Sequence, residues 1–284
     1  MKKILMLGIA FVISSAMLLT SCKKDEVNNN GNNSGNTENP GGDGSVTPNQ
    51  EYPSTAVVLP QAVADIDGNT YDAVQIGEQI WMAENLRTTR YADGTTIPMG
   101  TSTSSTTAYR YAPGPNYSND ENMDYVAHSG YLYNWPAVMH GESSSETNPS
   151  GVQGICPNGW HVPSDLEWNR LTTYLSNHSD YLCSGSSYNI AKALASTSGW
   201  QLSDEHECAV GNDPSTNNAS GFSAPPAGDY NGNYLDFGFR AYFWSATSNS
   251  DYVASGCYIN YKYASVTRIS SIRCNGFSVR CLHD

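Results

Sequence analysis

Cysteine is the residue type whose number and spacing promise the clearest chemistry in this chain. Seven cysteines occur among the 284 residues, and the first of them, Cys22, ends an apolar N-terminal segment. The even number that remains is typical, in an exported protein, of up to three disulfides, and the count alone leaves many pairings open. The remaining cysteines are Cys156, Cys183, Cys208, Cys257, Cys274 and Cys281.

One pair of these cysteines flanks a segment that predicts a β-hairpin. If the chain turns near Ala264, Cys257 and Cys274 face each other directly across the two strands. A bond between Cys156 and Cys281 would close a long loop and tie the start of a helical segment to the last strand. Cys183 and Cys208 are the pair that then remains. We therefore expect the disulfides Cys257–Cys274, Cys156–Cys281 and Cys183–Cys208.

Histidines and carboxylates form no recognisable catalytic or metal-binding motif. Patterns typical of zinc proteases, phosphate-binding loops and serine hydrolases are missing from the sequence. The segment His206–Cys208 could hold a metal, but a disulfide explains its cysteine more simply. Glycoside hydrolysis needs two converging carboxylates, and Asp229, Asp236 and Asp251 are available without a recognisable pairing. We expect no enzyme activity, no metal and no cofactor.

The first 22 residues predict export and lipid anchoring. Lys2 and Lys3 precede an apolar run of roughly fifteen residues, which is typical of a secretion signal and too short for a membrane span. The segment Leu19–Cys22 resembles the lipobox of bacterial lipoproteins, in which the cysteine becomes the acylated first residue. Residues 1–22 are therefore expected to be a lipoprotein signal peptide with Cys22 as the lipidation site.

Lipid attachment would tie the rest of the chain to the outer membrane, at the cell surface. The segment Lys23–Glu26 resembles the charged signal that sends lipoproteins of the Bacteroidetes there. Residues 23–55 are rich in Asn and Gly and predict a disordered tether, whose reach as a coil is on the order of 30 Å. Residues 56–284 predict one domain with one core. The net charge of −13 makes nucleic acid an unexpected partner.

The residues of this domain predict an α+β fold with a largely antiparallel sheet. Short strands flank a turn at Asp67–Gly68, and further strands return after Gly221. Ser164 and Glu167 form the capping-box pattern at the start of the clearest helix, and a second short helix is expected at Ile190–Ala195. Strands, then helices, then strands are typical of an α+β domain.

Several blocks of the domain resemble the Fibrobacter succinogenes major paralogous domain family. They include GYLYNW, GICPNGWHVPSDLEWNRL, YFWSAT and NGFSVRCLHD, in the order of that family from about residue 63 to the end. The family is similar to the C-type-lectin-like superfamily and to its formylglycine-generating branch. The resemblance implies a C-type-lectin-like domain of short antiparallel strands, two helices and long loops, whose closing strand Phe277–Cys281 is stapled to Cys156. The sugar-binding calcium triplets of C-type lectins and the catalytic cysteine motif of the formylglycine branch are missing.

A ligand face is expected between residues 229 and 273. Tyrosine mixed with small polar residues is the composition that binding loops favour, and period-two alternation places several of these side chains on one face of the hairpin. We expect a surface binding module for an unknown protein or glycan, with a structural or adhesin subunit as the alternative and a carbohydrate-active enzyme as the least favoured function. The candidate ligand-binding residues are Tyr230, Phe239, Arg240, Tyr252, Tyr258, Lys262, Thr267, Ile269, Ser271 and Arg273.

The resemblance also implies a way in which this face could vary. Some C-type-lectin-like scaffolds are targets of diversity-generating retroelements, which rewrite adenine-containing codons. Residues 257–263 and 269–274 carry the Tyr, Ser, Ile and Cys that rewritten Asn codons leave behind. A diversified face would tolerate replacement at the hairpin positions, and ordinary drift is the alternative explanation.

Overall fold

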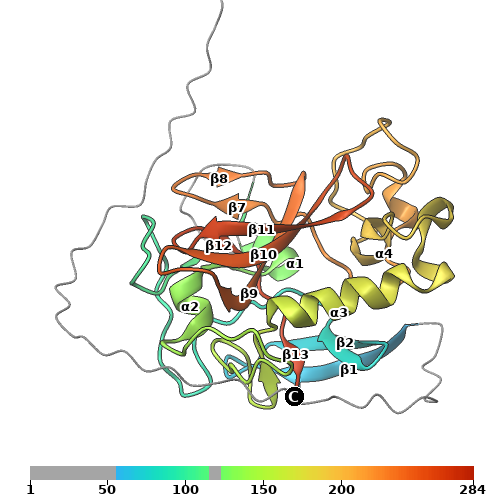
Figure 1. Ribbon diagram of the computed structural model, residues 1–284. Helices are drawn as coiled ribbons and strands as arrows, with labels where there is room; N and C mark the ends of the chain where they lie inside the picture. Colours follow the sequence, from blue (N-terminus) through green and yellow to red (C-terminus); the bar gives the residue numbers. More distant parts are fainter. Residues whose placement is uncertain (1–55, 115–122) are drawn as a thin grey trace, which may run out of the picture.

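Three sheets organise the part of the chain that the computed structural model describes, residues 56–114 and 123–284 (Figure 1). The named strands pair antiparallel throughout these sheets. The signal peptide, the acylation of Cys22 and the tether lie outside the described residues. The sheets are mostly antiparallel and the helices are few. This confirms the expected α+β class with a largely antiparallel sheet.

The first sheet joins the two ends of the domain. Its strand order is β1-β2-β3-β13-β6, so the last strand of the chain lies between β3 and β6. The Asp65 carboxylate shapes the β1–β2 turn by accepting the backbone N–H groups of Asp67 (3.0 Å) and Asn69 (2.9 Å). The strands are β1 (Val57–Ala64), β2 (Thr70–Ile76), β3 (Gln79–Met82), β6 (Trp160–His161) and β13 (Leu282–His283).

The other two sheets carry the predicted ligand face. The second has the order β11-β10-β9 and the third the order β4-β5-β12-β7-β8. The strands of the second sheet are β9 (Arg240–Ser248), β10 (Val253–Asn260) and β11 (Val266–Ile272). Those of the third are β4 (Arg110–Tyr111), β5 (Leu132–Asn134), β7 (Asp229–Tyr230), β8 (Tyr234–Leu235) and β12 (Gly276–Phe277).

The helices are short, and the described residues form four α-helices where the sequence predicted two. The capping box of α3 is present, because Ser164 Oγ accepts the N–H of Glu167 (3.2 Å) and Glu167 Oε2 accepts that of Ser164 (2.8 Å). None of the described helices is long and apolar enough to cross a membrane. The α-helices are α1 (Met123–Ser129), α2 (Trp135–Met139), α3 (Asp165–Ser176) and α4 (Ala191–Leu194), and the 3-10 helices are Ser179–Tyr181, Cys183–Gly185 and Pro214–Thr216.

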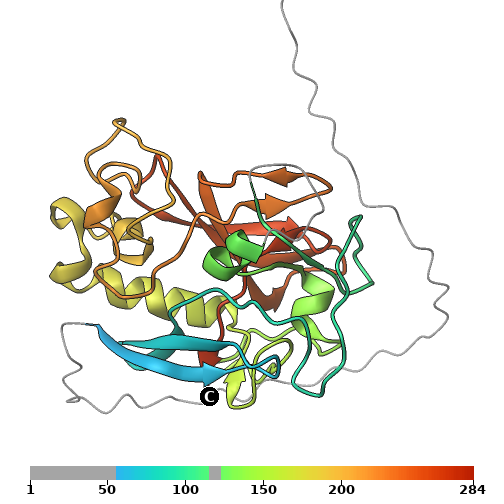
Figure 2. The same ribbon diagram turned by 180° about the vertical axis from the view of Figure 1, so that it is seen from behind.

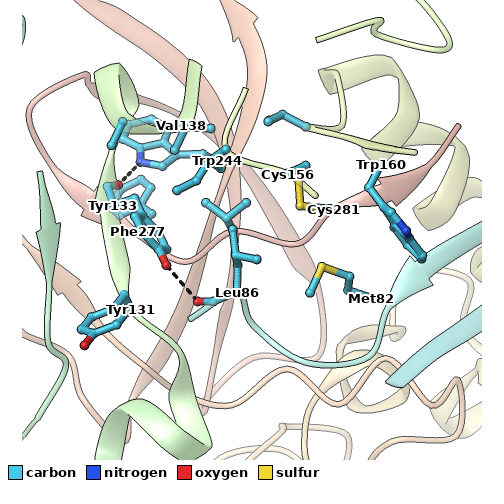
Figure 3. Packing of buried hydrophobic residues seen from close by; sticks show 14 of the residues in the cluster. Met82, Leu86, Tyr131, Tyr133, Val138, Cys156, Trp160, Trp244, Phe277 and Cys281 are labelled. Carbon is cyan, nitrogen blue, oxygen red and sulfur yellow. Dashed lines mark hydrogen bonds between the residues drawn. A yellow bond between two sulfur atoms is a disulfide. The ribbon is translucent and has the colours of Figure 1, made fainter. Parts of the chain in front are cut away.

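Aromatic side chains fill the centre of the molecule, where the sheets meet (Figure 3). The ring of Trp244 stacks on Phe277 with centroids 4.3 Å apart, and its indole N–H donates to the carbonyl of Tyr133 (2.8 Å). The Tyr133 hydroxyl in turn donates to the carbonyls of Thr88 (2.7 Å) and Leu86 (3.4 Å). The polar ends of these large rings are therefore satisfied inside the core.

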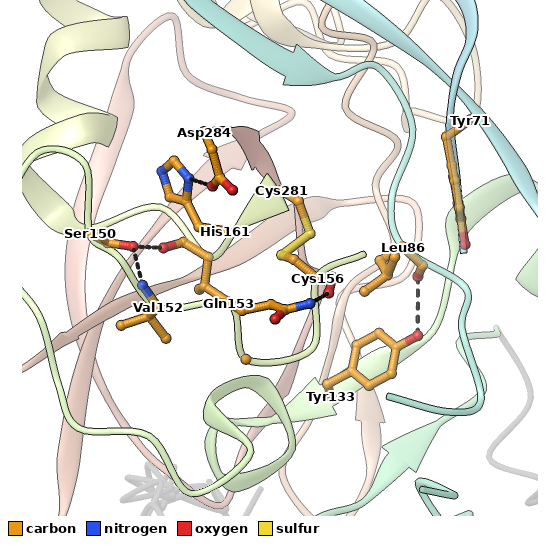
Figure 4. The surroundings of a disulfide bond; sticks show 12 residues. Tyr71, Leu86, Tyr133, Ser150, Val152, Gln153, Cys156, His161, Cys281 and Asp284 are labelled. Carbon is orange, nitrogen blue, oxygen red and sulfur yellow. Dashed lines mark hydrogen bonds and ion pairs between the residues drawn. A yellow bond between two sulfur atoms is a disulfide. The ribbon is translucent and has the colours of Figure 1, made fainter. Parts of the chain in front are cut away.

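Two of the three expected disulfides are present. Cys156 is bonded to Cys281, across 125 residues of sequence and with Cα atoms 5.9 Å apart (Figure 4). Cys183 is bonded to Cys208, across 25 residues. These bonds tie β13 to the loop before β6, and the segment after α3 to the loop that follows α4.

The predicted Cys257–Cys274 disulfide is wrong. The register of β10 with β11 places Cys257 opposite Arg268 and Ile259 opposite Val266, so the hairpin turns earlier than the sequence suggested, at residues 261–265. Cys257 then points into the core, where its thiol is buried and free. Burial raises the pKa of this thiol to about 12, so we expect Cys257 to behave as a small apolar core residue.

Candidate functional site

The predicted ligand-binding residues do not form one surface. One group lies on the face of β9–β11 that carries Tyr242, a second lies at the turn between β10 and β11, and a third lies at the opposite end of these strands. Tyr230 belongs to none of them, because its ring is buried and stacked on that of Tyr111 with centroids 4.0 Å apart. It holds the third sheet together and is not placed to contact a ligand.

The first group forms a mixed face that is partly covered. Tyr258 lies opposite Tyr242 on β9 and Thr267 on β11, and the two tyrosine rings are 5.4 Å apart. The guanidinium of Arg240 lies 5.8 Å from the centre of the Tyr258 ring. Ile269 is half-buried against the main core cluster, so it supports the sheet as well as bordering its surface. Ser271 is half-buried on the same strand, and its hydroxyl accepts from the Asn275 side chain (3.0 Å).

Two carboxylates converge beside this face, which the sequence did not predict. Asp236 Oδ2 accepts from Arg240 Nη1 (2.6 Å) and from the Tyr242 hydroxyl (3.0 Å). Asp229 is only 8% exposed and accepts no hydrogen bond from the described residues. Burial, the charge of Asp236 and the opposing charge of Arg240 set the pKa of Asp229, which is raised to about 7. Asp251, the other candidate, lies apart on the exposed β9–β10 loop.

This arrangement holds one carboxyl that can be protonated near neutral pH next to one that is paired with a cation. Such a split between two carboxyl groups is the electrostatic pattern of acid–base chemistry. However, the Asp236 carboxylate already accepts from Arg240 and Tyr242. Neither Asp229 nor Asp236 lines the cavity beside α1 or the cavity between the β2–β3 turn and α3. The pair is therefore more simply a part of the scaffold.

The second group is exposed and largely apolar. Phe239 is 40% exposed, and its ring meets that of Tyr261 edge-on with centroids 5.2 Å apart. Tyr263 is 53% exposed and Leu202 69% exposed. Lys262 Nζ lies 5.6 Å from the centre of the Tyr261 ring and is paired with the Glu205 carboxylate. We call this surface the tip patch, and it consists of Leu202, Phe239, Tyr261, Lys262 and Tyr263.

Backbone hydrogen bonds bring the loop of Leu202 to the hairpin turn. The N–H of Gln201 donates to the carbonyl of Gly238 (2.8 Å), and the N–H of Gly211 donates to the carbonyl of Tyr261 (2.7 Å). The N–H of Ser203 donates to the carbonyl of Gly211 (3.0 Å), which closes the loop on itself. Figure 1 shows the turn of the hairpin beside these loops near α4. Of this patch the sequence predicted only Phe239 and Lys262, and an exposed leucine between polar residues was the signal for the rest.

The third group consists of Tyr252 and Arg273, at the end of the sheet opposite the hairpin turn. Tyr252 is 64% exposed. The guanidinium of Arg273 lies 4.2 Å from the centre of the Trp135 ring and donates to the Ser248 hydroxyl. Burial lowers the pKa of Arg273. Arg273 is thus part of the packing, and Tyr252 is the exposed residue of this group.

His161 has a role in the fold. Its ring lies between two carboxylates. The Nδ1 atom is 2.8 Å from Asp284 Oδ1 (Figure 4), and the Nε2 atom is 3.0 Å from Glu167 Oε1. Burial alone would lower the pKa of His161, but the hydrogen bonds to Glu167 and Asp284 outweigh it and raise the pKa. The ring links β6 to the start of α3 and to the end of β13.

Among the described residues, no three His, Cys, Asp or Glu side chains gather in a way that could hold a metal ion. A cavity of about 550 Å³ does lie beside α1. It is bounded by the loop after β3, the loop after α4 and the segment before β7. None of the predicted ligand-binding residues lines it.

Comparison with known proteins gives one match. The family model described as the Fibrobacter succinogenes major domain matches residues 74–283. No curated protein and no solved structure matches the chain.

Proposed function

Because the chain belongs to the Fibrobacter succinogenes major domain family, we propose a function for the surface that its domain presents. The protein is a lipid-anchored binding module that contacts a protein ligand at the cell surface. The contact is made through the tip patch. The observation that carries this proposal is the gathering of exposed apolar side chains at one end of the domain.

The composition of the tip patch suits a protein ligand. Isolated exposed apolar residues are normal, but contiguous groups of large ones mark interaction surfaces. Leu202, Phe239 and Tyr263 offer apolar area, and the Lys262–Glu205 ion pair supplies a polar edge. An apolar centre with a polar rim is the usual anatomy of a protein–protein interface.

The scaffold beneath the patch is constrained, which lowers the entropy cost of binding. The Cys183–Cys208 disulfide closes the segment that carries Leu202 and Glu205. The N–H of Ala191, at the start of α4, donates to the carbonyl of Ala264 in the hairpin turn (2.9 Å). Loops that are already ordered before binding give up less conformational freedom in the complex.

Presentation at the surface completes the proposal. Acylation of Cys22 would fix the chain to the outer membrane, and residues 23–55 would act as the tether. We place the domain among C-type-lectin-like folds, and the insertion of β13 between β3 and β6, beside the first strands, supports that placement because it brings the two ends of the domain together.

We also propose that the face is diversified, but at fewer hairpin positions than the sequence suggested. Thr267 and Ser271 are half-exposed and Lys262 is held mainly by the Glu205 ion pair, so replacement there should leave the fold intact. Ile269 and Arg273 pack against the core and Trp135. Variation across a population should therefore concentrate at the first set and spare the second.

A binding screen with matched variants tests the proposal. The full chain is presented to arrays of surface proteins and of glycans, and hits are titrated with Tyr263→Ala, Phe239→Ala and the control Tyr252→Ala. We expect a protein hit whose affinity falls at least about tenfold with the first two variants and stays unchanged with the third. A protein ligand that all three variants bind equally well, or the absence of any protein hit, would contradict the proposed contact.

A further inference from the structure

The cavity beside α1 has the size and chemistry of a small-molecule site. Figure 2 shows α1 (green) on the face of the domain that is turned toward the viewer. The cavity measures about 550 Å³, and ligand sites generally measure roughly 300 to 1,000 Å³. We propose that this cavity binds a neutral saccharide unit.

One wall is aromatic. The rings of Tyr125 on α1 and Phe237 after β8 both line the cavity, with centroids 5.0 Å apart and planes inclined by 75°. Pro225 and Pro226 continue this apolar surface. A pyranose ring has a face made of C–H groups, and this face packs favourably against the electron-rich face of an aromatic ring.

Hydroxyl groups supply the polar side of the cavity. Ser129, Ser198 and Ser223 line it, and their hydroxyls make no hydrogen bond within the described part of the chain. Each can both donate and accept, as a sugar hydroxyl does, so reciprocal pairing with a ligand hydroxyl is available. A polyol with one apolar face is the ligand that uses both kinds of wall at once.

Two further polar side chains hold the cavity in shape. The Asn85 amide donates to the carbonyl of Ser129 (2.8 Å) and accepts from Arg280 Nε (2.7 Å). Ser196 Oγ donates to the carbonyl of Ser198 (2.8 Å) and accepts from the indole N–H of Trp200 (3.1 Å). These bonds fix the loops that bear the uncommitted hydroxyls, so the cavity is formed before any ligand enters.

Charge selects against acidic ligands. Glu84 and Asp124 line the cavity, and no lysine or arginine is among the described residues that line it. Arg280 lies behind the wall, where Asn85 and the carbonyls of Met82, Phe222 and Ser223 hold its donors. Besides these carboxylates, the lining offers an anionic ligand only the imidazole of His128, and the nearby Arg87 is already paired with Glu84. A neutral sugar carries no penalty from the carboxylates.

This site is separate from the tip patch, so the inference does not depend on the proposed function. Phe237 and Phe239 lie two residues apart, but Phe237 lines the cavity and Phe239 belongs to the tip patch. A substitution at one site can therefore be used as the control for the other.

Saturation-transfer NMR of the full chain tests the inference. The probes are methyl β-D-glucoside, methyl β-D-galactoside, methyl α-D-mannoside and N-acetyl-D-glucosamine, with D-glucuronate and adenosine as comparisons. We expect at least one neutral sugar to bind with a Kd in the millimolar range, which is about −4 kcal/mol, and D-glucuronate to bind at least tenfold more weakly. Phe237→Ala should weaken the sugar at least fivefold, and Tyr263→Ala should leave its Kd unchanged.

A second cavity variant guards against a folding artefact. Ser198→Leu adds volume at an exposed loop position and should abolish the sugar signal while near-UV circular dichroism stays that of the parent. Failure of every neutral sugar to bind at tens of millimolar would overturn the inference. So would binding of D-glucuronate or adenosine alone, or sugar binding that survives both cavity variants.

Discussion

Asp229→Asn should stabilise the protein, and the gain should grow as the pH rises. Asp229 is buried beside Asp236, and no described residue donates a hydrogen bond to it. Its native pKa of about 7 stands against an ordinary value of 3.8. Between these values the native state keeps a proton that the unfolded state has lost, so the free energy of unfolding falls as the pH rises from about 4 to about 7.

The size of the effect follows from the two pKa values. A difference between 3.8 and about 7 corresponds to up to about 4 kcal/mol at pH 8, where the parent must bury an ionised carboxylate and the asparagine variant need not. At pH 4 both side chains are neutral in the native state, and the two proteins should differ little in stability. Asn preserves the shape of the protonated acid, so packing changes are small.

Guanidinium unfolding of parent and variant at pH 4, 6 and 8 measures the difference directly. The exposed Asp251→Asn serves as the control for the loss of one carboxylate at the surface. Using differences cancels the contribution of His161, whose raised pKa also makes the stability depend on pH. A stability gain for Asp229→Asn that is equal at pH 4 and pH 8, or a loss at pH 8, would show that burial does not raise the pKa of Asp229 as stated.

Four other outcomes can be checked independently. Cys156→Ser should lower the free energy of unfolding by about 5 kcal/mol and Cys183→Ser by about 3.5 kcal/mol, because the first bond spans 125 residues and the second 25; equal losses in guanidinium melts would contradict this. Because the pKa of His161 is raised, its charged form stabilises the fold fully below pH 6.5, and this contribution is lost as the pH rises past the native pKa. His161→Gln should therefore flatten the plot of the free energy of unfolding against pH in that range. An unchanged plot would count against the ion pairs. Cys257, whose pKa burial raises to about 12, should react with a thiol reagent only on unfolding, as mapped by mass spectrometry, and rapid labelling of the native protein would be evidence against its burial. Cys22→Ala should release the protein from the membrane fraction, and a variant that still sediments with membranes would contradict lipid anchoring.

Local signals predicted the elements whose causes are local. The capping box of Ser164 and Glu167 forms as expected because both partners lie within one helical turn. The α2 helix was missed although its signal was present: Asn134 caps it by accepting the N–H of Ala137 (3.2 Å), and Pro136 stands in its first turn.

The predicted register of the β10–β11 hairpin was wrong, because it rested on the symmetric spacing of two cysteines and not on turn chemistry. The side-chain oxygen of Asn260 accepts the backbone N–H of Lys262 (2.9 Å), and the backbone carbonyl of Asn260 accepts the N–H of Tyr263 (3.1 Å). These bonds begin the turn directly after Asn260, which is what Asn favours. The turn therefore comes before Ala264, and Cys257 pairs with the wrong position for a disulfide.

Exposure of the candidate site could not be predicted from the sequence, because it depends on distant partners. Tyr230 is buried by Tyr111, which is far away in the chain. Leu202 is exposed at the tip because backbone bonds to Gly238 and the hairpin turn hold its loop there. Alternation along a strand gives the face of a residue but not what covers that face.

Photocross-linking on intact cells shows whether the tip patch contacts a protein ligand. The photoreactive p-benzoylphenylalanine replaces Tyr263 in the tip patch or, in a matched control, Tyr252 at the far end of the same sheet, and both side chains are more than half exposed. We expect a discrete cross-linked protein from position 263 and none from position 252. Cross-linking from position 252 alone, or no cross-linked protein from position 263 in cells that display the chain, would contradict it.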